Sequence, residues 1–326
     1  MNKISEYQQL IEQALKDKHY GTNPKELYEP VRYIMSLGGK RLRPVLVCLG
    51  CDFFGEPFEK AMHAALAVEI FHNFTLVHDD LMDNAPLRRN QQTVHEKWNG
   101  NTAILAGDAM VVAAYQELNK LDVKYLPLLI SVFSQTALQV CEGQQLDMNY
   151  EKVQKVSIQQ YLKMIELKTA VLVGASLKMG AIIGNAREED ANSLYEFGKH
   201  IGIAFQLQDD ILDVYADEKK FGKQKGGDII ANKKTYLLLK AIEMAEGNRY
   251  MKEELHQWIN APSFDAAEKV EAVTNIYNFL NIKELARNEM KKHYDTALGC
   301  LNNIPVSEQK KQVFIDFADS LMVREM

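Results

Sequence analysis

The stretch V-H-D-D-L-M-D-N-A-P-L-R-R occupies residues 77–89 and closes an apolar run with helical spacing that begins near Ala61. On a helix, Asp79 and Asp83 point the same way, and Asp80 lies beside them. Carboxylates crowded at one helix end repel one another unless a proton or a cation intervenes. Mg²⁺ is commonly held by one or two carboxylates together with the phosphates of a substrate. The stretch therefore predicts a helix that ends in a magnesium site.

Two arginines, Arg88 and Arg89, follow this acidic motif. Pro86 stands between them and the aspartates and is expected to have ended the helix. Guanidinium groups bind phosphate oxygens through paired hydrogen bonds. Carboxylates that hold a metal and guanidiniums that hold phosphate are together the parts of a diphosphate site.

The acidic pattern D-D-x-x-D occurs a second time, at Asp209, Asp210 and Asp213, inside the apolar run F-Q-L-Q-D-D-I-L-D-V. Acidic residues at helical spacing usually form a solvated helix face, which is the simpler explanation of either copy taken alone. A solvated face has no reason to recur inside two apolar helices. We therefore expect two facing helices that bind several Mg²⁺ ions.

The composition is that of a globular, largely helical protein. The chain has 326 residues, of which 47% are hydrophobic and 25% charged, and it contains only 8 prolines. No run alternates as a strand would and no solenoid repeat is present, so we expect an all-α fold in a single domain over residues 1–326. The net charge of −6 argues against a general nucleic-acid-binding protein.

The four cysteines do not predict a disulfide framework. Cys48 and Cys51 form a C-x-x-C, but a zinc site needs two more ligands, and Cys141 and Cys300 stand alone at remote positions. A redox motif would need a βαβ context, which the sequence lacks. We interpret Cys48 and Cys51 as small apolar residues in a helix.

The N-terminus is polar and amphipathic, which predicts no signal peptide. No uninterrupted apolar stretch reaches the length of a membrane span. The expected location is therefore the cytoplasm.

Helical periodicity divides the chain. Helices are expected over residues 3–18, 24–36, 57–83, 107–121, 126–147 and 190–215, with another beginning at an N-cap at Ser157 and a break near residues 260–263 in the C-terminal part.

Two glycine-bearing loops carry cations. Gly38 and Gly39 precede K-R-L-R-P, residues 40–44, at the expected start of a helix, where backbone and cations can hold a phosphate. The loop at residues 221–235 carries Lys223, Lys225, Lys233 and Lys234. A basic surface turn is the alternative for the first loop. A cationic loop beside a metal site can instead close over phosphates.

Six motifs in order, G-G-K-R-L-R-P, H-D-D-L-M-D-N-A-P-L-R-R, G-D-A-M, K-T-A, F-Q-L-Q-D-D-I-L-D and G-K-x-x-G-G-D…N-K-K-T, make residues 30–240 resemble the trans-prenyltransferases, the isoprenyl (polyprenyl) diphosphate synthases. The resemblance implies an all-α bundle with a deep central cavity, a homodimer and dependence on Mg²⁺. It also implies head-to-tail condensation of isopentenyl diphosphate with an allylic diphosphate (dimethylallyl, geranyl or farnesyl).

The resemblance also implies roles for single residues. The metal-binding set consists of the two aspartate motifs, Asp79, Asp80, Asp83, Asp209, Asp210 and Asp213. The residues matching those that hold the allylic diphosphate are Arg88, Lys168, Thr169, Gln206, Lys223 and Lys233, with Lys233 preferred over Lys234 because it directly follows Asn232. Those matching the isopentenyl diphosphate site are Lys40, Arg41, His72 and Arg89. The C-terminal V-R-E-M departs from the basic tail of many relatives, which leaves Arg324 without an expected role.

Product length is expected to depend on Phe74, Thr75 and Phe71, which precede the first motif. In the family, a large aromatic at the place of Phe74 forms a cavity floor, although aromatics at helical spacing are also ordinary core residues. Relatives with two aromatics directly before the motif tend to stop at fifteen carbons. Because the nearer residue here is the smaller Thr75, we expect geranylgeranyl diphosphate ahead of farnesyl diphosphate.

Two other functions remain open from the sequence. A terpene synthase also ionises a diphosphate with aspartate-rich helices, but it does not need the cations for a second diphosphate. A non-catalytic partner subunit of a prenyl synthase typically loses aspartates, whereas both motifs are whole here. A prenyl diphosphate synthase is the function we expect.

Overall fold

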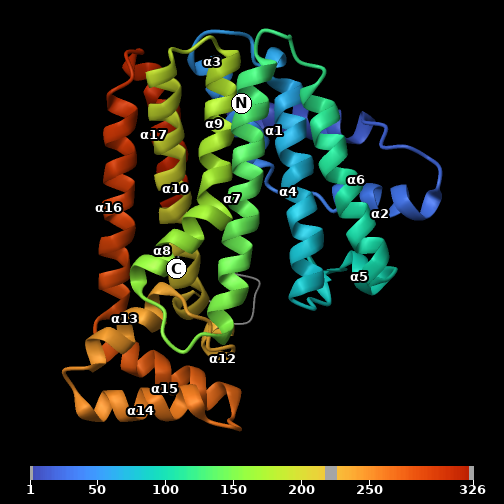
Figure 1. The fold of residues 1–326 in the computed structure, drawn as a ribbon. Coiled ribbons are helices and arrows are strands. Elements are labelled where there is room, and N and C mark those ends of the chain that lie inside the picture. The colour runs from blue at the N-terminus through green and yellow to red at the C-terminus, as the bar shows by residue number, and fades with distance from the viewer. Residues whose placement is uncertain (1–2, 217–225, 323–326) are drawn as a thin grey trace. The chain divides into compact units, whose positions relative to one another are not determined.

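The computed structural model of the protein describes residues 3–216 and 226–322, and nearly all of their regular structure is helical (Figure 1). The one sheet among these residues is the two-stranded antiparallel hairpin of β1 (Leu87–Arg88) and β2 (Gln91–Gln92). The expected all-α fold is confirmed. None of the helices in these two ranges combines the length and the apolar character that crossing a bilayer requires.

The chain divides into two compact units, each made of two stretches: Met1–Ser134 with Ala175–Tyr195, and Gln135–Gly174 with Glu196–Met326. Helices α7 (Leu126–Lys152), α9 (Val171–Ile183) and α10 (Glu188–Tyr215) each begin in one unit and end in the other. The single domain expected for residues 1–326 remains a prediction.

The first unit is built around α4, the helix that carries the first aspartate motif. Helix α4 covers Met62–Met82, and the other helices that lie wholly in this unit are α1 (Lys3–Asp17), α2 (Lys25–Ser36), α3 (Leu42–Phe53), a short 3₁₀ helix (Phe58–Ala61), α5 (Val94–Lys97) and α6 (Gly100–Leu118). An unbroken row of buried residues from Ala64 to Phe71 anchors α4 in the core.

The start of α6 differs from the expected helix over residues 107–121. The helix begins at Gly100 because the side chain of Asn99 caps it, accepting the backbone N–H of Thr102 at 2.9 Å. Gly107 therefore lies inside the helix, where a side-chain carbon would overlap the ring of His78 on α4. The glycine permits close packing of α4 and α6 and does not begin a helix.

Cys48 and Cys51 are both free and fully buried in α3. Burial raises the pKa of both thiols, so neither is a ready nucleophile or metal ligand. The interpretation of both cysteines as small apolar core residues is confirmed.

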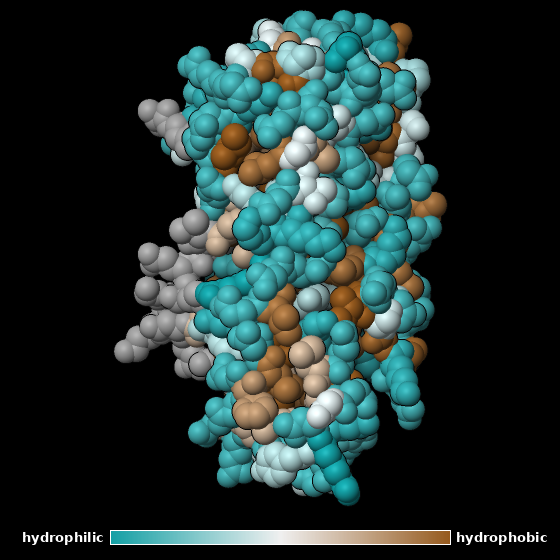
Figure 2. Space-filling model, turned by 90° about the vertical axis from the view of Figure 1, so that its left-hand side faces the viewer, coloured by the Kyte–Doolittle hydropathy of each residue, from teal (hydrophilic) through white to brown (hydrophobic). Residues whose placement is uncertain are grey.

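The second unit holds its own apolar core around α10, α13 and α15. Its elements after α7 are α8 (Ile158–Ile165), a π-helix (Glu166–Ala170), α9, α10, α12 (Gly227–Ile230), α13 (Tyr236–Ala245), α14 (Arg249–Asn260), α15 (Ala266–Phe279), α16 (Ile282–Asn302) and α17 (Glu308–Met322). Ser157 begins α8 through a capping box with Gln160, which confirms the expected N-cap. On the side of α16 the surface is mostly hydrophilic with separate apolar patches (Figure 2).

A buried ionic cluster ties the end of α6 to other parts of the first unit. The carboxylate of Glu117, 1% exposed, accepts hydrogen bonds from Lys18 and from Lys120 at 2.7 Å, and lies 2.7 Å from Nδ1 of His63. Burial alone would raise its pKa, but hydrogen bonds from these three groups outweigh burial and lower the pKa to about 2. The folded state therefore favours the ionised form.

The change Glu117→Gln is expected to lower the free energy of unfolding at pH 7 by about 3 kcal/mol, because three donors lose a buried anion. The folded-state pKa lies below the unfolded value, so this stabilisation is fully present above the unfolded pKa of about 4.5 and is lost as the pH falls toward 2. Urea unfolding at pH 7 and pH 3.5 measures both effects. The control Glu243→Gln removes an exposed pair with Lys240 and should cost less than about 1 kcal/mol. An equal loss at both pH values would contradict the ionic explanation.

Candidate active site

The first aspartate motif lies at the C-terminal end of α4. One of its carboxylates is buried, and the other two are more accessible than that one. Asp80 is 2% exposed and accepts two hydrogen bonds from Arg88, from Nε and from Nη2, both at 2.7 Å. Asp79 is half-buried and Asp83 is exposed. Asp80 therefore fixes the guanidinium of Arg88, while Asp79 and Asp83 place oxygen ligands where a hydrated cation can reach them.

The hairpin after α4 gives the two arginines different orientations. Arg88 lies on β1, whereas Arg89 and Asn90 form the turn with φ of 53° and 61°. Positive φ at both central residues is the geometry of a tight type I′ hairpin. The guanidinium of Arg89 donates to the carbonyl of Gly38 in the G-G-K loop. Arg88 and Arg89 therefore contact different protein groups, Asp80 and Gly38, and their assignment to two diphosphates stays a prediction.

The two glycines of the loop are needed for that contact. Gly38 and Gly39 have φ of 76° and 145°, which favour glycine. A side-chain carbon on Gly39 would also lie 2.8 Å from Nη2 of Arg89. The loop therefore lets the guanidinium of Arg89 lie directly against its backbone. The expected binding of a phosphate by this loop stays a prediction.

A cluster of cations surrounds His72. Nη1 of Arg43 lies 3.2 Å from Nε2 of His72, so the guanidinium donates to an unprotonated ring nitrogen. Burial, followed by the charges of Arg43, Arg89, Arg88 and Arg41, holds the pKa of His72 well below its ordinary value. The histidine is neutral at pH 7, and the positive potential around it attracts an anion.

Arg43 was among the cations of the first loop but not among the residues matched to the family. Its Nε–H is buried and has no hydrogen-bond partner within the described residues. A buried donor without a partner calls for an explanation such as a bound ligand. Arg43 is thus a functional candidate that the sequence comparison passed over.

Arg41 is held differently. It is 4% exposed, forms ion pairs with Glu69 at 2.6 Å and Glu12 at 2.9 Å, and donates to the carbonyl of Met35. Burial would lower the pKa of Arg41, but the two glutamates raise it. Lys40 is exposed. The guanidinium of Arg41 therefore fastens the loop to α1 and α4, and its direct role toward a diphosphate stays a prediction.

The second aspartate motif shows the same division in α10. Asp210 is 4% exposed and accepts hydrogen bonds from the hydroxyl of Tyr161 and from Nε2 of Gln206 at 3.3 Å. Burial raises the pKa of Asp210 to about 7. Asp213 accepts the backbone N–H of Asp228 at 3.0 Å, and Asp209 is half-buried. The middle aspartate of each motif is thus buried against a donor from another part of its unit.

Lys168 and Thr169 lie on the π-helix between α8 and α9. Single-turn π-helices are frequent at functional sites because they displace side chains from the regular helical path. Lys168 forms an ion pair with Asp147 of α7 at 2.5 Å, and Gly143 leaves room for its backbone. Thr169 Oγ1 lies 3.5 Å from Gln206 Oε1. Asp147 is not among the site residues predicted from the sequence. The sequence signal that could have identified it is the segment E-G-Q-Q-L-D, residues 142–147, at the end of the helix expected over residues 126–147.

The two adjacent lysines after α12 are placed differently. Lys234 donates to the carbonyl of Tyr150 at 2.5 Å, and burial lowers its pKa. The charge of Lys233 instead lowers the pKa of Asp210, so Lys233 lies toward the second aspartate motif. The preference for Lys233 over Lys234 stays a prediction. Lys223, Lys225 and Arg324 lie outside the described residues.

Phe71 and Phe74 belong to a row of ring contacts in the first unit. The centroids of Phe71 and Phe74 are 5.4 Å apart, those of Phe71 and Phe133 are 5.3 Å apart, and those of Phe74 and His78 are 4.7 Å apart. Phe71 is 2% exposed, whereas Phe74 is half-buried. Thr75 bonds to the carbonyl of His72 at 2.8 Å. Phe74 is therefore the more accessible of the two aromatics.

Comparison with known proteins identifies the family. The polyprenyl synthetase family model matches residues 24–277. The geranylgeranyl diphosphate synthase of Methanosarcina mazei is 37% identical over 306 residues, which is 93% of this chain and 91% of that protein. The enzyme of the same name from Sulfolobus acidocaldarius is 36% identical over 308 residues, covering 93% and 92% of the two chains.

A solved structure agrees with these relatives. The crystal structure of a geranylgeranyl pyrophosphate synthase superposes with a TM-score of 0.94 at 42% identity and covers 100% of both chains. The chain therefore belongs to the polyprenyl synthetase family and is a prenyltransferase.

Proposed function

We propose that the protein condenses isopentenyl diphosphate with an allylic diphosphate, head to tail, and releases pyrophosphate. The observation that carries this is the cation cluster of Arg43, Arg88 and Arg89 around a neutral His72, in the unit whose α4 ends in Asp79 and Asp83. The product is geranylgeranyl diphosphate ahead of farnesyl diphosphate. The names of the relatives support this order.

Mg²⁺ fits the oxygen ligands of the two motifs. No three carboxylate, thiolate or imidazole groups in residues 3–216 and 226–322 are clustered as a metal site. A magnesium ion, however, commonly uses one or two carboxylates and completes its shell with phosphate and water. In our proposal Asp79, Asp83 and Asp209 supply carboxylate oxygens. A magnesium ion bound there would neutralise negative charge on the leaving diphosphate.

The remaining aspartates act on protein groups in this proposal. Asp80 orients Arg88, and Asp210 accepts the hydroxyl of Tyr161. Asp213 holds the start of α12 through the N–H of Asp228. These contacts keep cations and loops in place before substrate arrives, which preorganises the electrostatics of the site.

The cations divide between two diphosphates. Lys40, Arg43, His72 and Arg89 hold isopentenyl diphosphate, with Arg41 supporting the loop. Arg88, Lys168, Thr169, Gln206, Lys223 and Lys233 hold the allylic diphosphate. As the allylic C–O bond breaks, these groups stabilise charge on the departing pyrophosphate, and the double bond of isopentenyl diphosphate attacks the allylic cation. The released pyrophosphate then takes a proton from the carbocation that this attack forms, and the electrons of the broken C–H bond become the new double bond. No single protein base stands out for this step among residues 3–216 and 226–322.

Incubation with isopentenyl diphosphate, each allylic diphosphate and Mg²⁺ tests the function. Chromatography of the hydrolysed products should show mainly geranylgeraniol. Cyclised hydrocarbon formed from the allylic substrate alone would instead indicate a terpene synthase. Product that forms only after a second synthase subunit is added would indicate a non-catalytic partner. The family match favours neither alternative.

We also propose a homodimer. Helix α6 exposes Ile104, Leu105 and Val112, which are 45%, 59% and 58% accessible in the single chain. Their helical spacing places them along one side of α6, where a second copy would cover them. Light scattering should give twice the 37.1 kDa mass of the chain, and the mass of one chain would contradict the proposal.

The change Phe74→Ala is expected to lengthen the product by one or more isoprene units, because Phe74 is the accessible member of the aromatic row before Asp79. Phe71→Ala should act mainly in the double variant, since Phe71 is buried behind it. Chromatography of hydrolysed products measures chain length independently of rate. The matched control Phe279→Ala removes an aromatic that is 64% exposed on α15. An unchanged product in all three α4 variants would place the cavity floor on another helix.

A further inference from the structure

The second unit contains a buried lysine, Lys269, whose ammonium group donates hydrogen bonds to neutral oxygens. Lys269 on α15 is 1% exposed, and its ammonium donates to Oδ1 of Asn232 at 2.8 Å and to the carbonyl of Ile230 at 3.4 Å. The ammonium also lies 4.0 Å from the centre of the Phe264 ring. Lysine is almost never fully buried unless it is paired. Both hydrogen-bond acceptors here are neutral oxygens of one short segment, residues 230–232.

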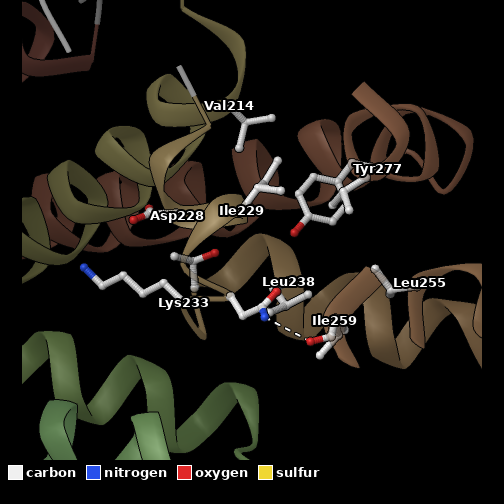
Figure 3. Close-up of a pocket in the computed structure, with 11 residues that line it drawn as sticks. Val214, Asp228, Ile229, Lys233, Leu238, Leu255, Ile259 and Tyr277 are labelled. Atoms are coloured by element: carbon white, nitrogen blue, oxygen red, sulfur yellow. Dashed lines mark hydrogen bonds between the residues drawn. The ribbon is translucent and has the colours of Figure 1, made fainter. Parts of the chain in front are cut away.

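Asn232 is the point at which that segment changes direction. Its φ of 53° is left-handed, a conformation that asparagine tolerates better than most residues. Its side chain is held at both ends, because Oδ1 accepts from Lys269 and Nδ2 donates to the carbonyl of Ile259 on α14 at 3.0 Å, the dashed line in Figure 3. Helices α14 and α15 therefore fix the conformation of Asn232 together.

The next residue is Lys233. Its backbone N–H donates to the carbonyl of Asp228 at 2.9 Å, and its own carbonyl accepts the N–H of Thr235 at 2.8 Å. In Figure 3 its side chain extends away from the apolar lining of the pocket formed by residues such as Leu255 and Tyr277. The N–H of Asp228 in turn donates to Asp213. Residues 228–233 are thus held between α14–α15 and the second aspartate motif.

We propose that Lys269 is a positioning residue for Lys233. By holding Asn232 in its left-handed conformation, Lys269 aims the ammonium of Lys233 toward the second aspartate motif and the diphosphate bound there. This inference rests on the proposed function, in which Lys233 holds the allylic diphosphate. A lysine that only filled the core would stabilise the fold without acting on one substrate in particular.

The change Lys269→Met keeps a buried apolar stem and removes the hydrogen bonds to Asn232 and Ile230. We expect the KM for the allylic diphosphate to rise about tenfold. Displacement of the Lys233 ammonium should weaken its charge-assisted hydrogen bond to the diphosphate by about 1.4 kcal/mol, which corresponds to that factor. The KM for isopentenyl diphosphate should not change. The control Lys252→Met removes an exposed lysine of α14 that pairs with Glu246, and both KM values should stay as in the parent protein.

A double-mutant cycle separates positioning from a general loss of stability. Lys233→Ala alone should raise the KM for the allylic diphosphate. Adding Lys269→Met should raise this KM no further, because the ammonium that Lys269 positions is already absent. Additive effects, or equal increases for both substrates, would overturn the inference. If Lys233→Ala leaves the allylic KM unchanged, the proposed role of Lys233 fails, and the inference falls with it for that distinct reason.

If Lys269→Met does not fold, Asn232→Gly decides the question. Glycine accepts the positive φ but lacks the side chain that Lys269 and Ile259 hold. An allylic KM raised about tenfold with a normal circular dichroism spectrum supports the positioning role. An unchanged allylic KM in Asn232→Gly overturns it.

Discussion

Alanine at Asp79 or at Asp209 is expected to lower turnover at least about 100-fold, the cost of removing one preorganised electrostatic group from an active site. Both are the first aspartates of their motifs, and both are half-buried, so their oxygens can meet a cation and a substrate phosphate. Turnover is measured at saturating concentrations of both substrates and Mg²⁺. The loss should appear in the rate even when the metal is in excess.

Removal of Mg²⁺ is expected to lower turnover as the two substitutions do. EDTA should abolish activity, and added Mg²⁺ should restore it in the parent protein. The control Asp295→Ala takes away an exposed carboxylate of α16 that pairs with Lys291 and should leave turnover unchanged. If Asp79→Ala kept nearly the turnover of the parent protein, the acidic end of α4 would have no part in the reaction. The same result in Asp209→Ala would exclude the acidic motif of α10.

The sequence predicted the acidic helices and the loops better than it predicted how single side chains are used. Within D-D-x-x-D, all three aspartates look alike. The structure buries Asp80 against Arg88 and Asp210 against Tyr161. Tyr161 lies on α8, far along the chain from Asp210, so no spacing rule within the motif identifies it. The distinction depends on tertiary neighbours and not on periodicity.

The K-R-L-R loop shows the same limit. Its cations were expected near a phosphate, and the contact of Arg89 with Gly38 places the hairpin against this loop. Which arginine faces His72 could not be derived from the sequence, because Glu12 and Glu69 come from α1 and α4 and engage Arg41. Arg43 is left beside His72. Helix starts were predictable where a cap was recognised, as at Ser157, and wrong where Asn99 was overlooked.

Single substitutions can test whether the two diphosphates bind to different cations. Arg89→Ala is expected to raise the KM for isopentenyl diphosphate about tenfold or more, because a guanidinium bond to a charged phosphate is worth about 1.5–3 kcal/mol. Arg89 stands in the hairpin turn against Gly38, and its charge acts on His72. Its loss therefore weakens the cluster around His72 while the bond between Arg88 and Asp80 remains.

Lys168→Ala should instead raise the KM for the allylic diphosphate by a similar factor and lower turnover as well, because in the proposed mechanism its ammonium contacts the leaving diphosphate. The π-helix and the ion pair with Asp147 hold this lysine in the second unit, whereas Arg89 belongs to the first. The matched controls are Lys163→Ala and Arg249→Ala, whose side chains are 56% and 90% exposed. Steady-state kinetics with each substrate varied in turn gives both KM values. If Arg89→Ala and Lys168→Ala weakened both substrates equally, the cations would act as one cluster, and the division into two diphosphate sites would be wrong.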